Sequence, residues 1–295
     1  METHLITIGG VNCSLRIASG LIGEVMDLVL ADYRRWGFAS SGDARISLEI
    51  GERAEQAPKE QPGIFCHRLH YESVTATLVL DTSSFAGTIG LELRREDRQT
   101  PVRIAELIET FLCNAYLFYF LLHDLGTFLH ASAVAEKGKG YIFAGQRQTG
   151  KSTAAKLSQP RTILCDELVL LRKDGEGGPR VYGTPWLGDS APVNRSALCC
   201  GVHFLVQSQE NRLTPMTTMN AVSELLREGV IGSFLSVPAV QKIAPYAKLF
   251  FLLIDLLQNI SCRRLHFKKD NSFWSAIYEH EQQALQKPEC RLARA

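Results

Sequence analysis

The chain has 295 residues, and its hydrophobic content of 45% is enough to fill one large core or two ordinary ones, which excludes a disordered protein. Its 32 basic and 31 acidic residues give a formal net charge of +1, so the composition carries no electrostatic footprint for nucleic acid or an anionic membrane. We therefore expect no nucleic-acid partner and no membrane, and partners have to be inferred from local motifs.

The first ten residues, METHLITIGG, lack the basic region and apolar core of a secretory signal, which predicts a cytoplasmic protein. The longest apolar runs begin at Phe111 and Leu249, and both are shorter than the roughly 20 residues that cross a bilayer, so we interpret them as core helices. The cysteines are scattered without a C-x-x-C pair, which favours reduced thiols. In the stretch CHRLH, Cys66, His67 and His70 are close in sequence, but no second ligand cluster supports a metal site there.

Residues 1–125 are predicted to form a small, strand-rich α+β domain. Period-two alternation in HLITIGGVNCSLRI, ARISLEI and VTATLVLD indicates strands, and SGLIGEVMDLVLADYRRW has helical spacing. Thr100 followed by Pro101 is typical of a helix start, and the apolar spacing behind them predicts a long closing helix to about Leu122.

Residues 126–295 are predicted to form a second domain, of α/β type. TFLHASAVAEKGKGYIFAG indicates two strands joined by a glycine turn, STAAKL a helix, and TILCDELVLLR a strand. Towards the C-terminus we expect helices at MNAVSELLREG and AKLFFLLIDLLQ, a strand at SCRRLHFKK and a closing helix at NSFWSAIYEHEQQALQ.

A complete G-x-x-x-x-G-K-[ST] motif lies between the apolar strand YIFAG and the helix STAAKL. It consists of Gly145, Gln146, Arg147, Gln148, Thr149, Gly150, Lys151 and Ser152. Glycines let successive amide N–H groups converge on one anion, and the helix N-terminus adds a positive dipole end. Lys151 would reach the β and γ phosphates and Ser152 would bind Mg²⁺. The alternative is a strand–turn–helix that holds no ligand.

Three further residues are candidates for the same site. Asp166 and Glu167 are adjacent acids in an apolar strand, where a metal or a hydrogen-bond donor has to meet them; the alternative is an exposed turn. His130 lies in the strand before the phosphate loop, where a lone histidine is more often a satisfied core residue.

The order LHASAV, hairpin, GYIFAGQRQTGKSTAAKL, LCDELVLL resembles the catalytic domain of the HPr serine kinase/phosphorylase family, over roughly Phe128 to Leu226. The resemblance implies a phosphoenolpyruvate-carboxykinase-like phosphate-loop domain that transfers the γ-phosphoryl group of ATP to a serine of a protein or peptide. It also permits a homo-oligomer.

The resemblance further implies residue roles. The loop from Gly145 to Ser152, with Thr153 after it, would bind ATP, and Lys151 would act in catalysis. Asp166 would be the general base, Ser152, Asp166 and Glu167 would hold Mg²⁺, and His130 would lie near the phosphate and the acids.

Three departures limit what the resemblance implies. Arg147 and Gln148 replace small residues of the loop, the acidic pair is Asp-Glu rather than Asp-Asp, and the basic signature associated with phosphorylase activity has no clear counterpart. We therefore expect a kinase without phosphorylase activity and do not expect HPr to be its acceptor. Some relatives that occur beside peptide-modification systems phosphorylate a serine of a precursor peptide, which is an alternative acceptor. Two alternatives stay open: a nucleotide-binding regulatory or scaffold protein without transfer activity, and a nucleotide hydrolase acting as a switch.

Overall fold

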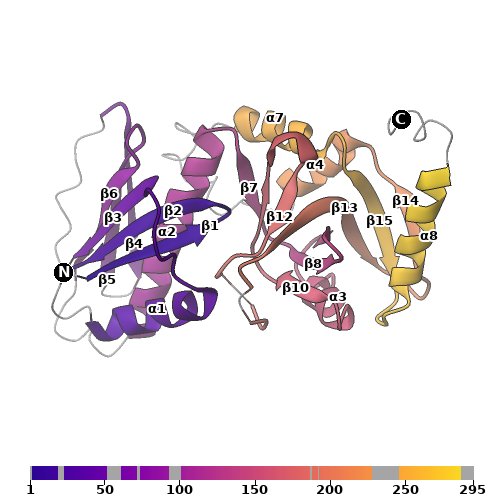
Figure 1. Ribbon diagram of the computed structural model, residues 1–295, viewed down its shortest axis with the longest axis horizontal. Helices are drawn as coiled ribbons and strands as arrows, with labels where there is room; N and C mark the ends of the chain where they lie inside the picture. The colour runs from indigo at the N-terminus through magenta and orange to yellow at the C-terminus, as the bar shows by residue number, and fades with distance from the viewer. Residues whose placement is uncertain are drawn as a thin grey trace. The chain divides into compact units, whose positions relative to one another are not determined.

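The computed structural model describes residues 2–18, 23–51, 61–71, 74–92, 101–186, 188–191, 193–227 and 246–286. The chain divides into two compact units, one of Met1–Thr127 with Ser233–Leu249 and the other of Phe128–Gly232 with Phe250–Ala295 (Figure 1). The predicted division into domains 1–125 and 126–295 stays a proposal. The two sheets and several helices confirm a mixed α+β protein.

The first unit is built on a six-stranded sheet in the order β1-β2-β3-β6-β5-β4. The elements are β1 (Glu2–Ile8), β2 (Val11–Ile17), α1 (Gly23–Trp36), β3 (Ile46–Gly51), β4 (Ile64–Tyr71), β5 (Val74–Asp81), β6 (Ala86–Glu92) and α2 (Pro101–Leu122). β2, β3 and β6 are parallel, and the outer pairs are antiparallel hairpins. Alternating burial along β2 and β3 shows that one sheet face is packed, as the period-two pattern predicted.

Helix α2 is a core helix of this unit. It ends at Leu122 as predicted, and its predicted cap Thr100 lies outside the described residues. Its length and apolar composition would suffice to span a membrane, yet 78% of its most apolar stretch is buried inside the protein. The Tyr116 hydroxyl donates a 2.7 Å hydrogen bond to the Ile6 carbonyl, which ties α2 to β1.

The second unit is built on a nine-stranded sheet in the order β10-β8-β9-β13-β12-β11-β7, with β15 paired to both β13 and β14. Its elements are β7 (Gly126–Leu129), β8 (Ser132–Glu136), β9 (Lys139–Ala144), α3 (Lys151–Leu157), β10 (Thr162–Cys165), β11 (Val169–Arg172), the 3-10 helix η2 (Gly175–Gly177), β12 (Arg180–Tyr182), β13 (Ser196–Gln207), β14 (Arg212–Pro215), α4 (Thr218–Arg227), α7 (Tyr246–Leu257), β15 (Ser261–Phe267) and α8 (Phe273–Gln286).

Strand directions bring five chain segments to one edge of this sheet. β9, β13 and β15 run parallel to one another. β8 is antiparallel to β9, and β10 is antiparallel to β8, so β10 runs in the direction of β9. The carboxyl ends of β9, β10, β13 and β15 therefore share an edge with the beginning of β8. Loops at the carboxyl ends of parallel strands are where α/β sheets bind ligands.

A hydrophobic cluster fixes the helices beneath this edge. Buried side chains of β8, β9, β13 and β15 pack with Ala154 and Ala155 of α3 and with Phe273, Trp274 and Ile277 of α8. The Trp274 indole N–H donates to the Ser158 hydroxyl at 3.0 Å, which joins α8 to the last turn of α3. The helix that follows the glycine loop is thus held by both packing and a buried hydrogen bond.

Two sequence predictions need correction. His130 was expected within a strand, and the acids Asp166 and Glu167 within another, but both strands are interrupted at these residues. His130 lies in a bend between β7 and β8, and the acids lie in a bend between β10 and β11. The physical reason is a change of partner: β8 and β10 pair with each other, whereas β7 and β11 lie at the far end of the strand order. The Ala131 N–H donates to the Glu167 carbonyl at 3.1 Å, so the two bends lie side by side.

Candidate functional site

The loop after β9 has the backbone that its glycines predict. Gly145 and Gly150 have φ angles of 144° and 107°, which side-chain-bearing residues rarely adopt. A Cβ on Gly150 would lie 3.2 Å from the Phe267 ring, and one on Gly145 would lie 2.9 Å from the Thr149 hydroxyl. Gln148 also has a positive φ, 68°, and its carbonyl accepts a 3.0 Å hydrogen bond from the Gln207 side chain. The loop is therefore curled tightly and held from β13 and β15.

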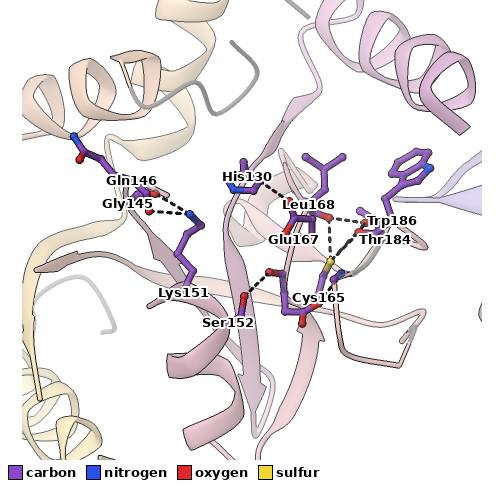
Figure 2. Close-up of polar contacts among 12 residues, drawn as sticks. His130, Gly145, Gln146, Lys151, Ser152, Cys165, Glu167, Leu168, Thr184 and Trp186 are labelled. Carbon is purple, nitrogen blue, oxygen red and sulfur yellow. Dashed lines mark hydrogen bonds and ion pairs between the residues drawn. The ribbon is translucent and has the colours of Figure 1, made fainter. Parts of the chain in front are cut away.

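Lys151 begins α3 and is largely buried, at 7% exposure. Its ammonium group donates to the carbonyls of Gly145 and Gln146 at 3.0 and 3.1 Å, across the loop (Figure 2). Its own carbonyl accepts a 2.8 Å hydrogen bond from the buried Ser132 hydroxyl of β8. Backbone oxygens thus hold the Lys151 ammonium group inside the loop. An anion bound by the loop would contact the ammonium group there.

Ser152 follows directly and faces the acidic bend. Its hydroxyl lies 3.5 Å from the Asp166 carbonyl, a contact at the outer limit of hydrogen bonding. The loop, the first turn of α3 and the acids are therefore neighbours in space.

His130 and Glu167 form a pair beside the loop. The His130 Nδ1 lies 3.0 Å from a Glu167 carboxylate oxygen, and both side chains are partly exposed (Figure 2). Burial and then the Lys151 charge lower the pKa of His130, and these outweigh the opposite effect of Glu167. The lowered pKa favours the neutral ring, in which Nδ1–H would donate to the carboxylate.

Asp166 has a different environment from its neighbour. It is 2% exposed, and its carboxylate accepts hydrogen bonds from the Gly188 and Asp189 amides at 3.0 and 2.9 Å and from the Ser190 hydroxyl at 2.7 Å. A Cβ on Gly188 would lie 3.3 Å from both carboxylate oxygens, so glycine permits this close approach. The loop formed by residues 188–190 thus covers Asp166.

The loop borders a cavity of about 670 Å³. It is lined by residues from four segments of the sheet edge: His130, Arg147, Gln148, Gly150, Lys151, Ser152, Thr153, Glu167 and Lys269. Gly145, Gln146, Thr149 and Asp166, which the sequence placed in the site, do not line it. The sequence analysis missed Lys269, because the sequence does not show that the end of β15 reaches the glycine loop. The two lysines that end the predicted strand SCRRLHFKK were the only signal.

The donors at this edge fit Mg²⁺ only together with a ligand. Within the described ranges, no three His, Cys, Asp or Glu side chains form a group that could hold a metal, at CHRLH or elsewhere. Ser152 and Glu167 both line the cavity and supply a hydroxyl and a carboxylate oxygen. Mg²⁺ is usually bound by one or two carboxylates together with substrate phosphates and water, so this donor set fits a magnesium–phosphate complex.

Fold and site define a mixed α+β protein whose second unit carries a cation-rich cavity at the carboxyl edge of its sheet. The chain belongs to the ScmC family: the family model described as "SynChlorMet cassette protein ScmC" matches residues 96–283. That description names a cassette and states no reaction.

The chain is also similar to a solved structure described as "Structure of the Hpr(Ser) kinase/phosphatase from Coxiella burnetii". Identity is 12% and the TM-score 0.28, over 54% of this chain and 98% of that chain. No curated protein matches. The specific phosphate-loop kinase fold therefore stays a prediction.

Proposed function

We propose that the chain is an ATP-dependent kinase that transfers the γ-phosphoryl group to a serine hydroxyl of a protein or peptide, without phosphorylase activity. The observation that carries the proposal is the convergence on one cavity of the glycine loop, Lys151, Ser152 and the His130–Glu167 pair. Each comes from a segment that ends or begins at the same sheet edge. Phosphoryl transfer needs mainly positioning and electrostatic stabilisation, which such an edge can supply.

In this proposal the loop from Gly145 to Thr153 binds the phosphates of ATP. Its amide groups and the N-terminus of α3 attract the phosphate oxygens. Lys151 exchanges its hydrogen bonds to the Gly145 and Gln146 carbonyls for phosphate oxygens. Arg147 lines the cavity and adds a second cation from the loop.

Ser152 and Glu167 are the proposed Mg²⁺ ligands, with Asp166 contributing from the adjacent position. When bound, the metal neutralises charge on the phosphate oxygens. Glu167 also accepts the hydrogen bond from His130, so this histidine fixes the direction of the carboxylate. His130 is proposed as a positioning residue whose uncharged state at pH 7 avoids a further positive charge beside Lys151.

Asp166 is the proposed general base. The Ser190 hydroxyl donates to its carboxylate at 2.7 Å, and this contact supports the proposal that an acceptor serine could take the same place. An acceptor serine would replace Ser190 after displacement of the 188–190 loop. The acceptor oxygen would then form the new bond to the γ-phosphorus, the bond to the bridging oxygen of ADP would break, and the hydroxyl proton would pass to Asp166.

The test has two parts. The first is calorimetric titration of the wild type and Lys151→Ala with Mg²⁺ and a non-hydrolysable ATP analogue. We expect saturable binding by the wild type and its loss in the variant; equal affinity of the two proteins would refute the loop assignment. The second is incubation with Mg²⁺, γ-labelled ATP and a library of serine peptides. We expect phosphoserine on a subset of them.

A second candidate function is a nucleotide-binding regulatory or scaffold protein without transfer activity. The observation that favours it is the covering of Asp166 by three donors of the 188–190 loop, outside the cavity lining. Saturable binding of the analogue with no phosphoserine on any peptide, in the wild type and in Ser190→Ala, would select this candidate over the kinase.

A further inference from the structure

Lys269 lies at the phosphate loop, although it is more than a hundred residues away from it in sequence. It follows β15, whose last residue, Phe267, packs its ring beside Gly150. The turn around it is fixed: the Lys268 N–H donates to the Asn211 side-chain oxygen at 2.7 Å, and the Ser208 N–H donates to the Phe267 carbonyl at 3.1 Å. The backbone therefore presents Lys269 at the cavity in a defined place.

The two lysines of this turn differ in their charge partners. Lys268 has an Asp270 carboxylate oxygen 3.4 Å from its ammonium nitrogen. Lys269, like Arg147, has no ion-pair or hydrogen-bond partner within the part of the chain that the structure describes, and both line the cavity. Together with Lys151 they make three cations against the single carboxylate, that of Glu167, among the residues that line the cavity. The cavity thus has a net positive charge that a triphosphate, which remains anionic with Mg²⁺ bound, would neutralise.

The sheet order places Lys269 and the acids on opposite sides of the loop. β9, which leads into the loop, has β8 and β10 on one side and β13 and β15 on the other. His130, Asp166 and Glu167 come from the β8 and β10 side. Gln207, Phe267 and Lys269 come from the β13 and β15 side. In phosphoryl transfer the attacking and leaving oxygens are roughly in line, so a base on one side requires the leaving group to depart towards the other.

We propose that Lys269 binds the diphosphate part of the nucleotide and stabilises the negative charge that develops on the leaving nucleoside diphosphate. The inference rests on the proposed kinase function and adds a binding residue that the loop motif does not contain. Because the charge is on the β-phosphate side, Lys269 contributes to the binding of a nucleoside diphosphate as much as to that of a triphosphate. Lys151 and Ser152, in contrast, also meet the terminal phosphate.

The experiment compares Lys269→Ala, Lys269→Arg and Lys268→Ala with the wild type, by calorimetry with Mg²⁺ and either ADP or the non-hydrolysable ATP analogue. Lys268→Ala is the matched control, since it removes the same charge from the adjacent, exposed residue that does not line the cavity. For Lys269→Ala we expect about tenfold weaker binding of both nucleotides, the size of one hydrogen bond to a charged group. Lys269→Arg and Lys268→Ala should stay near the wild type.

The outcomes separate this inference from the function on which it rests. If the wild type binds the analogue, Lys151→Ala does not, and Lys269→Ala binds like the wild type, the loop assignment stands and the role of Lys269 is overturned. An effect of Lys269→Ala on the ATP analogue alone would place the lysine at the terminal phosphate and also overturn the proposal. If the wild type binds neither nucleotide, the proposed function fails and this inference fails with it.

Discussion

The two sides of the glycine loop at residues 145–152 differ in chemistry although they lie at the same sheet edge. On the β8 and β10 side, His130, Asp166 and Glu167 can exchange or orient protons. On the β13 and β15 side, Gln207, Phe267 and Lys269 hold the loop and add a cation, and none of them is a base at neutral pH. Side chains that can orient or accept a proton therefore lie on one side of the loop and the added cation on the other. Under the proposed function, variants on the two sides should affect different measurements.

The largest effect is expected on the acidic side. Asp166→Asn should reduce the rate of phosphoserine formation by about 10² to 10⁴, the usual contribution of a general base. It should spare most of the affinity for the ATP analogue, because the two proposed Mg²⁺ ligands that line the cavity, Ser152 and Glu167, are unchanged. The measurement is the initial rate on a peptide that the wild type labels, with Asp174→Asn, an exposed acid of the same unit, as control. A rate within threefold (about 0.7 kcal/mol) of the wild type would mean that another group takes the proton.

The loop itself is the next most sensitive element. Gly150→Ala forces a side chain into φ 107° and against the Phe267 ring, which should weaken binding of the analogue by about 2–4 kcal/mol. Gly138→Ala is the control: it has a φ of 81° in the turn between β8 and β9, with nothing within 4 Å of an added Cβ. It should lose about 1–2 kcal/mol of stability and keep its affinity. Equal losses of affinity in both variants would contradict the tight fit at Gly150.

The stability of the protein is expected to depend on pH through His203, a residue of β13. His203 is buried, and neither ring nitrogen has a hydrogen-bond partner among the residues that the structure describes. Burial, with smaller effects of His280 and Arg263, lowers its pKa from 6.5 to about 3. Below pH 6.5 the unfolded chain therefore binds a proton that the folded chain does not, so stability falls as the pH drops towards 3.

The corresponding measurement is urea unfolding at pH 7 and pH 5. Between pH 7 and pH 5, His203 should lower the free energy of unfolding of the wild type by about 2 kcal/mol. His203→Phe should lack this contribution to the pH dependence. Phenylalanine suits the site because the His203 ring packs beside those of Tyr141 and Phe143, with centroids 6.3 and 5.9 Å away. The same pH dependence in both proteins would assign the acid sensitivity to other groups.

The smallest expected effect concerns the tie between β13 and the loop. Gln207→Ala removes the 3.0 Å hydrogen bond to the Gln148 carbonyl. This loss should weaken binding of the ATP analogue by about 0.5–1.5 kcal/mol. Gln258→Ala, at the end of α7, removes a comparable exposed hydrogen bond away from the cavity and should change nothing. No loss of affinity in Gln207→Ala would mean that Phe267 and the glycines fix the loop without it.

Local patterns predicted much of the fold but not where its strands break. Periodicity located the helices at Pro101–Leu122 and Phe273–Gln286, and the motif located the turn into α3. The bends at His130 and Asp166 could not be predicted, because an apolar run does not reveal that successive parts of it pair with different strands. The 188–190 loop over Asp166 and the position of Lys269 depend on pairing between distant strands, which no local window contains.

The most direct test of the central claim is a crystal structure of the protein with Mg²⁺ and a non-hydrolysable ATP analogue. We expect phosphates on the Gly145–Ser152 loop, the diphosphate part towards Lys269, and the terminal phosphate towards Ser152 and Glu167. An analogue bound elsewhere, or one whose terminal phosphate points to Lys269 and away from the acids, would contradict the separation of the two sides.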